Sequence, residues 1–561
     1  MAAEPAQHDS SQPALTIPAL LIQRLRQDAD RPALYVPRGG QFDSVCWASL
    51  IDAAASLAAG LSDLGLQPGD RVAVVSPNRY EWVVCDLALL GLGAVHVPIH
   101  NALAGPQIAW QIRDCGARLV LLAGPDQASR LTSLSEPPAE VRYAAFDPCH
   151  AELAGTPVLP WTHWHASPQR GRELIQHAAA TVQPSQLATI LYTSGTTGEP
   201  KGVMLSHANL ISNARATLQA FGHDPADLRL CWLPLSHVFA RTCDLYITLV
   251  AGTPLALAES PEKVMDNCKA IRPTLMCGVP YFFEKVQRTL CEQGRADEPG
   301  ALANAFGGRI RALTSGGAAL PDHVARFYHA RGVMLVQGYG LTESSPVITV
   351  STPGQVKIGT VGRPIPGVDV RIAPDGEILT RGPHVMLGYW NKPQATAEAI
   401  RDGWLHTGDL GELDADGFLR ITGRKKELIV TAGGKNVAPV YLEALLTADP
   451  LIQQAMIVGE GRKFLAALIV PAPEALRAEI IARRIPVTSA AEALRHPHVL
   501  ALYEEHIRAR LADVSHYEQV AKFVLLNRAF SIEQGELTPT LKLRRSVIQE
   551  HFAEEIERMY G

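Results

Sequence analysis

The stretch Ile190-Leu-Tyr-Thr-Ser-Gly-Thr-Thr-Gly-Glu-Pro-Lys-Gly202 decides how the rest of the chain is interpreted. The apolar residues 187–192 predict a buried strand, which runs into a loop of glycine and hydroxyl side chains. Glycine lets backbone N–H groups approach an anion closely, and hydroxyls and Lys201 add donors. The loop is therefore a candidate phosphate site, although Gly202 departs from the Walker A pattern. Taken alone, a polar turn joining two strands explains these residues equally well.

Length and composition limit the class of protein. The 561 residues are too many for one core, so we expect two or more domains. The hydrophobic content of 47% is ordinary for a globular protein, and a net charge of −5 gives no indication of a nucleic-acid partner. The nine cysteines contain no CxxC pair, which favours free thiols in a reducing, cytoplasmic compartment over disulfides or a zinc site.

The sequence does not predict a membrane-spanning segment. The first 18 residues are polar and lack the basic and apolar regions of a secretory signal. The longest apolar stretch, residues 82–99, is interrupted by Asp86, His96 and Pro98, so we interpret it as a core helix followed by a strand. The sequence does not decide whether the protein contacts the inner face of the membrane peripherally. It does not predict the oligomeric state either.

Strands and helices alternate through the first two thirds of the chain, which predicts βαβ units and a parallel sheet. We expect helices at residues 20–28, 50–64, 80–91, 108–115 and 208–221, strands at 71–75, 94–97, 119–122 and 228–233, an irregular segment at 133–172, and a renewed βα rhythm at 268–340. Residues 356–388 predict a small barrel or an antiparallel sheet, because short strands alternate with Gly and Pro turns there.

A charge run at residues 424–427 follows a predicted strand at 419–423 and is interpreted as a linker. Beyond it lie a compact α+β segment and a predicted C-terminal helix at 547–560. The predicted fold class is therefore α/β. A large N-terminal domain, residues 1–423, holds parallel or mixed βαβ sheets and the barrel-like subdomain. A small α+β C-terminal domain comprises residues 424–561.

Gln337-Gly-Tyr-Gly-Leu-Thr-Glu343 is the second informative motif. Its glycines flank an aromatic ring, and a hydroxyl precedes a carboxylate. Tyr339 could stack on a base, Thr342 could bind a phosphate, and Glu343 could hold Mg²⁺ through a phosphate oxygen.

Four weaker features each have an ordinary structural explanation. His237 ends Leu233-Pro-Leu-Ser-His237 and, taken alone, is better explained as a structural histidine. Ser315-Gly-Gly-Ala318 could face a purine or could be a plain turn. Asp409 could accept ribose hydroxyls or serve a turn, and Lys542 near the C-terminus could simply be a surface lysine.

The succession of these motifs resembles the AMP-forming adenylate synthetase superfamily, which comprises acyl-CoA synthetases, luciferases and adenylation domains. The resemblance covers about residues 36–560. The sequences Gly423-Arg-Lys-Lys-Glu-Leu-Ile-Val-Thr-Ala-Gly-Gly-Lys-Asn-Val-Ala-Pro439 and Leu537-Thr-Pro-Thr-Leu-Lys-Leu-Arg-Arg545 look like the long-chain fatty acyl-CoA synthetase branch. Residues 233–241 also match that branch, except that Ala240 replaces its glutamate.

The resemblance implies a fatty acid–CoA ligase that uses ATP, Mg²⁺ and CoA, with a mobile C-terminal domain. It implies catalytic roles for Lys542, His237, Thr342 and Glu343, with Glu343 also at the metal, and a hinge at Lys426. The implied nucleotide- and CoA-binding residues are Thr193, Ser194, Gly195, Thr196, Thr197, Gly198, Lys201, Gly316, Gly317, Ala318, Gly338, Tyr339, Gly340, Asp409, Arg424, Gly433 and Gly434.

Other functions compete with this one. An acyl-AMP ligase that loads a carrier protein, or a CoA ligase for medium-chain or aryl acids, would use the same adenylation residues. The absence of an extra insert after the hinge favours transfer to CoA. A nucleotide-binding regulatory protein with an inactive site is disfavoured, because Lys201, Glu343, Asp409, Arg424 and Lys542 occur together. Luciferase-like oxidation needs the same residues, but nothing in the sequence favours it.

Overall fold

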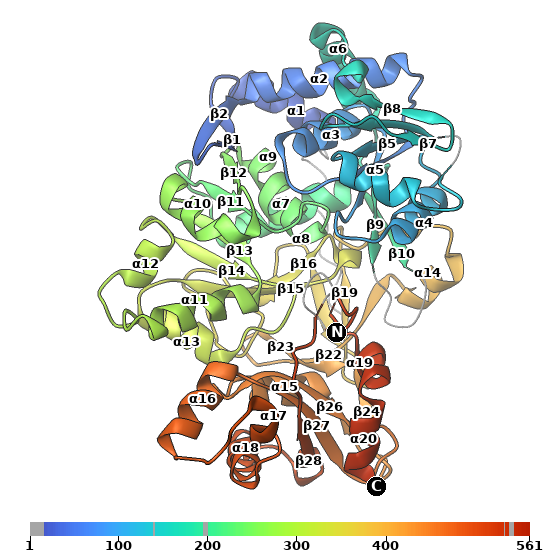
Figure 1. The fold of residues 1–561 in the computed structure, drawn as a ribbon. Helices are drawn as coiled ribbons and strands as arrows, with labels where there is room; N and C mark the ends of the chain where they lie inside the picture. Colours follow the sequence, from blue (N-terminus) through green and yellow to red (C-terminus); the bar gives the residue numbers. More distant parts are fainter. Residues whose placement is uncertain (1–15, 139–140, 194–199, 532, 538–542) are drawn as a thin grey trace, which may run out of the picture.

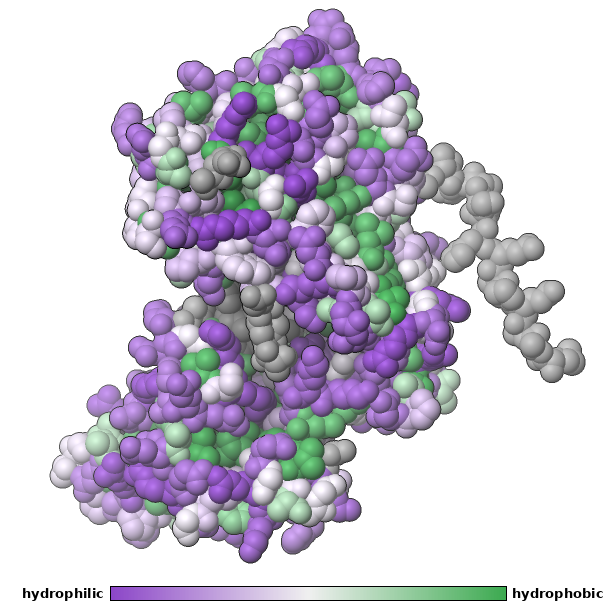
Figure 2. Space-filling model, turned by 90° about the vertical axis from the view of Figure 1, so that its right-hand side faces the viewer, coloured by the Kyte–Doolittle hydropathy of each residue, from purple (hydrophilic) through white to green (hydrophobic). Residues whose placement is uncertain are grey.

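The computed structural model describes residues 16–138, 141–193, 200–531, 533–537 and 543–561. It has a larger upper part and a smaller lower part, coloured orange to red in Figure 1. Hydrophilic side chains cover most of the face in Figure 2, and the surface is indented between the two parts. Among the helices of the described ranges, none combines the length and the apolar character needed to cross a bilayer.

Two nine-stranded sheets organise the described residues of the larger part. The first sheet runs in the order β17-β16-β15-β14-β13-β11-β12-β1-β2, and the second in the order β20-β10-β9-β4-β3-β5-β6-β8-β7. The strands of the first sheet are β1 Pro32–Arg38, β2 Gln41–Cys46, β11 Arg229–Cys231, β12 Leu255–Leu257, β13 Leu275–Gly278, β14 Ala312–Ser315, β15 Leu335–Gly340, β16 Val347–Val350 and β17 Arg363–Pro364. Those of the second are β3 Arg71–Val75, β4 Val95–Ile99, β5 Leu119–Leu122, β6 Arg142–Ala145, β7 Glu152–Leu153, β8 Thr156–Pro160, β9 Leu187–Thr193, β10 Lys201–Ser206 and β20 Gly388–Tyr389.

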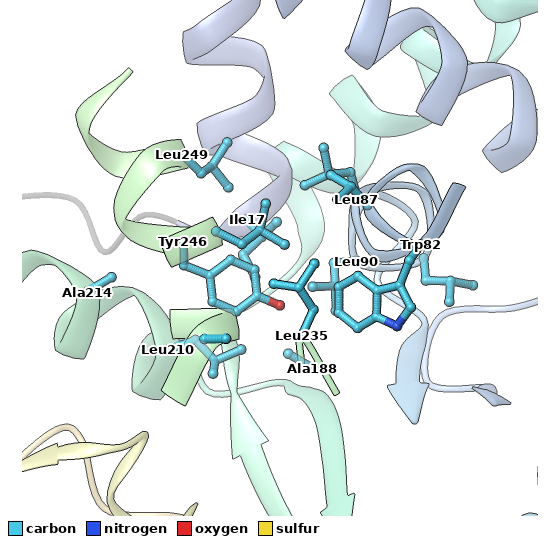
Figure 3. Close-up of a cluster of buried hydrophobic side chains, with 14 of the residues drawn as sticks. Ile17, Trp82, Leu87, Leu90, Ala188, Leu210, Ala214, Leu235, Tyr246 and Leu249 are labelled. Atoms are coloured by element: carbon cyan, nitrogen blue, oxygen red, sulfur yellow. The ribbon is translucent and has the colours of Figure 1, made fainter. Parts of the chain in front are cut away.

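Helices lie between the sheets and on both outer faces. The inner layer holds α1 Ile17–Gln27, α2 Trp47–Asp63, α3 Tyr80–Gly91, α6 Pro168–Thr181, α7 His207–Phe221 and α9 Ile247–Ala251. α4 Gly105–Cys115 and α5 Pro125–Thr132 cover the second sheet, and α10 Val264–Ile271, α11 Pro280–Glu292, α12 Ala301–Ala305 and α13 Asp322–Ala330 cover the first. Alternate residues of β3 face the two layers, because Val72 and Val74 join the inner core while Ala73 and Val75 pack toward α4. Figure 3 shows the inner core around Trp82, Leu235 and Tyr246.

A curled antiparallel sheet follows, as the sequence predicts for this region. It contains β18 Asp369–Ile372, β19 Glu377–Arg381, β22 Trp404–Leu413, β21 Ile400–Arg401 and β23 Leu419–Arg424, with α14 Pro393–Ala399 beside β20. The predicted α/β fold class is confirmed. The irregular segment predicted at residues 133–172 is wrong, since β6, β7, β8, the 3₁₀ turn Trp161–Trp164 and the start of α6 lie there.

The smaller part is built on the sheet β26 Ile452–Val458, β27 Leu465–Pro471 and β28 Val520–Leu525, beside the hairpin β24 Ile429–Val430 and β25 Asn436–Val437. α15 Pro439–Thr447, α16 Pro473–Ala482 and α18 Pro497–Arg510 pack on one face of the sheet, with the short α17 Ala490–Ala493. α19 Arg545–His551 and α20 Ala553–Tyr560 pack on the other. The single helix predicted at 547–560 is therefore two helices, because the chain turns at Phe552, which is buried in this core.

A buried cluster of charged side chains connects the segment at Arg241 with α3, β4 and β9. The Arg241 guanidinium donates to Asp86 of α3 and, at 2.7 Å, to the Thr189 hydroxyl of β9. The Asp86 carboxylate also lies 2.7 Å from Nδ1 of His96 on β4. Arg241, Asp86 and His96 are fully buried, and Ala240 is buried beside them. Although Ala240 lacks the carboxylate of the resembled branch, Arg241 therefore keeps an acidic partner from another helix, as a buried charge requires.

Three buried histidines make stability depend on pH. Burial lowers the pKa of His96, His207 and His384 to about 4, whereas an unfolded histidine titrates near 6.5. The unfolded chain therefore binds protons first as the pH falls, so their contribution is full above pH 6.5 and is lost toward pH 4. We expect the free energy of unfolding, measured with urea, to fall by up to about 1.4 kcal/mol per histidine per pH unit in this window. A free energy of unfolding that stays constant from pH 6.5 to 4.5 would contradict this expectation.

Candidate active site

The predicted motifs gather at one edge of the first sheet. The parallel strands β11, β13, β14 and β15 are neighbours there. The chain leaves β11 toward His237, leaves β14 into the Gly316-Gly317 turn, and leaves β15 toward Glu343. Ligands of open α/β sheets bind outside the carboxyl ends of the strands. The fold therefore brings three motifs that are distant in sequence to the edge where a ligand is expected.

Gly316 and Phe239 show how closely two of these motifs approach. A Cβ built on Gly316 would lie 2.8 Å from the Phe239 ring, so a side chain at this position would displace the ring. Gly317 follows with φ +81°, a conformation that favours glycine. His237 is exposed, and its Nδ1 accepts the Phe239 N–H at 3.2 Å at the start of the helical run α8 Val238–Ala240, the π-helix Arg241–Tyr246 and α9. The sequence analysis did not identify Phe239, because only this tertiary contact reveals it.

Asp409, Tyr339 and Arg424 form the best-defined cluster of the site. The Tyr339 hydroxyl donates to Oδ2 of Asp409 at 2.7 Å, and Nε of Arg424 donates to Oδ1 at 2.7 Å. Asp409 on β22 and Arg424 on β23 are direct partners in the antiparallel ladder. Burial alone would lower the pKa of Arg424, but the Asp409 carboxylate raises it overall, and burial raises the pKa of Tyr339 far above its usual value. Each carboxylate oxygen keeps a lone pair that a hydroxyl could reach.

Tyr389, which the sequence analysis did not identify, contacts both Lys201 and Glu343. β9 and β10 form a hairpin in which Thr193 and Lys201 face each other. The Lys201 ammonium lies 4.7 Å from the centre of the Tyr389 ring, and the Tyr389 hydroxyl donates to Oε1 of Glu343 at 2.9 Å. Tyr389 reaches this place because β20 pairs with β10. The aromatic pair Tyr389-Trp390 after Gly388 is the only sequence signal, and nothing in it predicts this pairing.

Lys426 lies between two segments that are held by different parts of the molecule. Upstream, Lys425 Nζ contacts Asp375 Oδ2 at 2.7 Å on the curled sheet. Downstream, Glu427 lies 3.9 Å from Arg545 Nε of α19, and Arg545 donates to Glu443 of α15 at 2.8 Å. Lys426 itself is exposed, and the core of the smaller part begins at Ile429. Lys426 thus lies between one residue that contacts the curled sheet and one that contacts the smaller part.

The remaining predicted residues divide into three groups. Gly338, Gly340 and Thr342 lie on β15 and on the 3₁₀ turn Thr342–Ser344 beside Glu343, and Ala318 is exposed after the Gly317 turn. Gly433 and Gly434 lie in the exposed turn of the β24–β25 hairpin, and the hydrogen bonds described for that turn do not reach the Asp409 cluster. Ser194, Gly195, Thr196, Thr197, Gly198 and Lys542 lie outside the described residues.

Comparison with family models and known sequences gives consistent matches. A model described as AMP-binding enzyme matches residues 21–390, and one described as AMP-binding enzyme C-terminal domain matches residues 426–561. The chain is 35% identical to the long-chain-fatty-acid–CoA ligase FadD15 of Mycobacterium bovis, over 97% of both chains. It is 28% identical to a long-chain-fatty-acid–CoA ligase of Xenopus laevis, over 98% of this chain and 84% of that one.

Solved structures share the fold. The anthranilate CoA ligase AuaEII in complex with anthranoyl-AMP superposes with a TM-score of 0.76 at 20% identity, covering 97% of this chain and 98% of that chain. A fatty acyl CoA synthetase of Mycobacterium tuberculosis superposes with a TM-score of 0.66 at 25% identity, covering 96% and 99% of the two chains.

Proposed function

Because the chain belongs to the AMP-binding enzyme family, as an ATP-dependent, AMP-forming acid–CoA ligase, we propose that it joins long-chain fatty acids to CoA. The observation that carries this proposal is the similarity to a long-chain-fatty-acid–CoA ligase at 35% identity over 97% of both chains. The clustering of Lys201 with Glu343, and of Tyr339 with Asp409 and Arg424, supports it.

In the first step, a fatty carboxylate oxygen attacks the α-phosphorus of ATP and pyrophosphate leaves, giving acyl-AMP. Both reactants are anions, so the site must align them and supply positive charge. We assign Lys201 and residues 193–198 to the β- and γ-phosphates, and Lys542 to the oxygens of the carboxylate and the α-phosphate. Thr342 lies beside this phosphate site, and His237 borders the carboxylate.

The nucleoside is assigned to the edge of the first sheet. Gly316, Gly317 and Ala318, in the turn after β14, and Gly338, Tyr339 and Gly340, at the end of β15, frame the base. Asp409 accepts hydrogen bonds from the ribose hydroxyls, with Arg424 and Tyr339 holding its carboxylate. These contacts orient the α-phosphate for attack in line with the departing pyrophosphate.

Glu343 suits a magnesium ion that accompanies ATP. Glu343 is half-buried, and the one side-chain hydrogen bond found for its carboxylate among the described residues is the Tyr389 hydroxyl at Oε1, which leaves oxygen lone pairs for a hard cation. A bound Mg²⁺ would neutralise phosphate charge during transfer of the adenylyl group. The residues of the chain hold Glu343 in place from two sides, through the Tyr389 hydroxyl and through the Glu343 carbonyl, which accepts the Met386 N–H at 2.9 Å.

In the second step, the CoA thiolate attacks the acyl carbonyl carbon, the bond to the adenylate oxygen breaks, and AMP leaves. We propose that residues 424–561 form a mobile domain that turns about Lys426 between the two steps. The turn withdraws Lys542 and brings Gly433 and Gly434 toward the CoA arm. The separate anchoring of Lys425 and Glu427 supports this pivot.

A ladder of acids tests the proposed function. Pyrophosphate release is measured with ATP, Mg²⁺ and fatty acids from short to long, each with and without CoA. Turnover that peaks at long chains and requires CoA is the expected result. A peak at medium-chain or aryl acids would replace the substrate assignment, and pyrophosphate release without thioester formation would indicate a carrier protein as acceptor.

The Tyr389→Phe variant tests the contact between Tyr389 and Glu343. Removing the hydroxyl takes away a hydrogen bond to a charged group, which contributes about 1.5–3 kcal/mol. We expect kcat/KM for ATP to fall by roughly tenfold or more and the Mg²⁺ requirement to rise, because Glu343 loses its orienting donor. The exposed Tyr281 gives the matched control, Tyr281→Phe. Equal kinetics and equal Mg²⁺ dependence in both variants would show that Tyr389 does not orient Glu343.

A further inference from the structure

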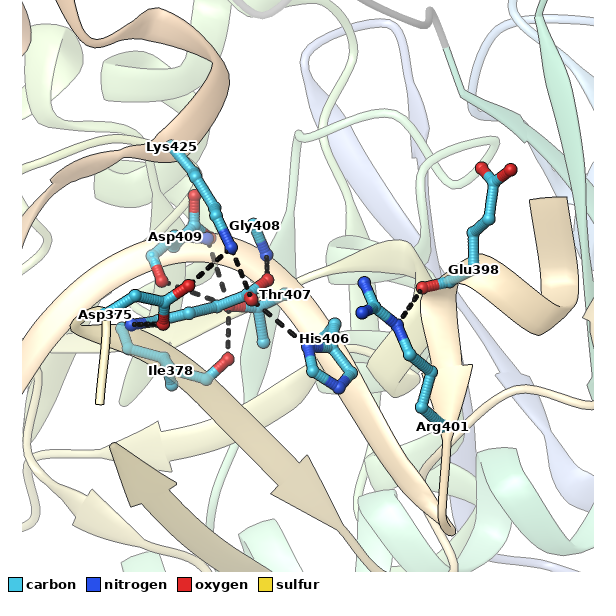
Figure 4. Close-up of polar contacts among 10 residues, drawn as sticks. Asp375, Ile378, Glu398, Arg401, His406, Thr407, Gly408, Asp409 and Lys425 are labelled. Carbon is cyan, nitrogen blue, oxygen red and sulfur yellow. Dashed lines mark hydrogen bonds and ion pairs between the residues drawn. The ribbon is translucent and has the colours of Figure 1, made fainter. Parts of the chain in front are cut away.

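Glu377 on β19 is a buried carboxylate with three nitrogen partners. These partners belong to Gly408, Lys425 and His406, which are labelled in Figure 4. Oε1 accepts the Gly408 N–H at 3.0 Å. Oε2 accepts the Lys425 ammonium at 3.2 Å and lies 3.1 Å from Nδ1 of His406. The residue is only 5% exposed. A carboxylate that is this far removed from water and this fully engaged fixes the positions of the groups that surround it.

The partners of Glu377 stand next to the residues assigned to the ribose. Gly408 immediately precedes Asp409 within β22, at a bulge where the pairing with β19 shifts register, and its φ of +73° favours glycine. A second set of contacts holds the same bulge: the Thr407 hydroxyl donates to the Ile378 carbonyl at 2.7 Å and accepts the Asp409 N–H at 3.1 Å. β19 therefore holds the backbone on the amino side of Asp409 through Glu377 and its neighbour Ile378.

Lys425 connects the Glu377 carboxylate to Arg424, the second residue of the Asp409–Arg424 pair. It immediately follows Arg424, whose guanidinium holds Oδ1 of Asp409. The buried Glu377 side chain thus contacts both the β22 bulge before Asp409 and Lys425, which follows Arg424. Lys425 also precedes Lys426, so the position of the proposed pivot and the position of the ribose carboxylate share one anchor.

The charge of Glu377 is maintained despite its burial. Burial alone would raise the pKa of Glu377, but hydrogen bonds from His406, Lys425 and the Gly408 backbone lower it overall. The carboxylate is therefore ionised at neutral pH and acts only as an acceptor. Ionised acceptors form the stronger hydrogen bonds.

We propose that Glu377 is a positioning residue for the nucleotide ribose: it holds the bulge at Gly408 and Lys425 so that Asp409 and Arg424 meet the ribose hydroxyls. This inference rests on the proposed function, in which Asp409 binds those hydroxyls. Glu377 touches no substrate itself. Its effect should therefore be seen only with nucleotides that carry the hydroxyls which Asp409 contacts.

The test compares ATP with 2′,3′-dideoxy-ATP, which lacks both ribose hydroxyls. Dissociation constants are measured by calorimetry for the full chain and for the Glu377→Gln variant, which keeps the size of the side chain and loses its charge. We expect the unaltered chain to bind ATP roughly tenfold more tightly than the dideoxy nucleotide. Glu377→Gln should lose at least about fivefold in ATP affinity and keep its dideoxy-ATP affinity within about twofold.

Two further variants complete the design. Lys425→Met removes one donor from Glu377 at a half-exposed site and should show the same selective loss in smaller size, about twofold to threefold. This variant decides the matter if Glu377→Gln fails to fold. Asp369→Asn is the control, because Asp369 pairs with Arg381 on the same curled sheet, and the hydrogen bonds found for its side chain among the described residues go to Arg381. It should bind both nucleotides as the unaltered chain does.

The outcomes separate this inference from the proposed function. Equal weakening of both nucleotides by Glu377→Gln or Lys425→Met would show a general structural role and overturn the inference. Unchanged ATP affinity in a folded Glu377→Gln would also overturn it. If the unaltered chain does not distinguish the two nucleotides, the ribose role of Asp409 fails, and the inference falls with that assignment.

Discussion

Lys542→Ala is expected to abolish adenylation while leaving transfer of a supplied acyl-AMP to CoA intact. In the first step this lysine would place one positive charge between two anionic groups as they meet. Preorganised donors of this kind contribute about 10²–10³-fold to the rate. The second step has no such collision, because the acyl-AMP carbonyl is already activated. We therefore expect pyrophosphate release from ATP and fatty acid to fall by at least about 10²-fold.

The two half-reactions are measured separately, with ATP and fatty acid for the first and with synthetic acyl-AMP and CoA for the second. Lys522→Ala is the matched control, because Lys522 is an exposed lysine on β28 of the same part of the molecule. It should retain both half-reactions. Equal loss of both half-reactions in Lys542→Ala would contradict its assignment to adenylation alone.

Lys426→Pro should do the reverse, keeping adenylation and losing thioester formation. Proline fixes φ near −65° and so restricts the backbone where the two anchored sides meet. Upstream, Lys425 is bound to Asp375, and downstream, Glu427 lies beside Arg545, so the two neighbours of Lys426 contact different parts of the molecule. If the domain cannot turn, CoA cannot reach the adenylate, and we expect at least about a 10²-fold loss of thioester formation, the scale set by misplaced reactants.

Lys426→Ala is the control for this variant. It removes the side chain and leaves the backbone free, so both half-reactions should continue within about twofold. If Lys426→Pro kept both half-reactions intact, the hinge would lie elsewhere. A loss of both by Lys426→Pro, with Lys426→Ala active, would show that the substitution disturbs the adenylation site through the neighbouring Arg424.

The sequence correctly predicts those strands and helices whose apolar residues match their burial in the fold. β3 and α3 have the predicted bounds, because β3 is a continuous apolar run and α3 is buried along most of its length. The strands within residues 133–172 were missed, because β6 and β8 are short strands near a sheet edge with mixed polarity. The break at Phe552 was missed because no glycine or proline marks it.

The residues of the candidate site also divide into those that the sequence could predict and those that it could not. Lys201, Glu343 and Asp409 could be chosen from their motifs, since these residue types carry the chemistry of phosphate, metal and ribose binding. Tyr389 and Glu377 could not, because their importance comes from strand pairing: β20 beside β10 places Tyr389, and β19 beside β22 places Glu377. Single-sequence periodicity predicts strands and not their partners.

The most direct test of the account follows the oxygen atoms of the fatty acid. The protein is incubated with ATP, CoA and a long-chain fatty acid carrying ¹⁸O in its carboxylate. The ¹⁸O content of the released AMP and pyrophosphate is then measured by mass spectrometry. If the carboxylate attacks the α-phosphorus and the thiolate then displaces the adenylate, each AMP carries one ¹⁸O and the pyrophosphate carries none. ADP with labelled orthophosphate, or AMP without label, would contradict the acyl-AMP intermediate on which every assignment made for this site depends.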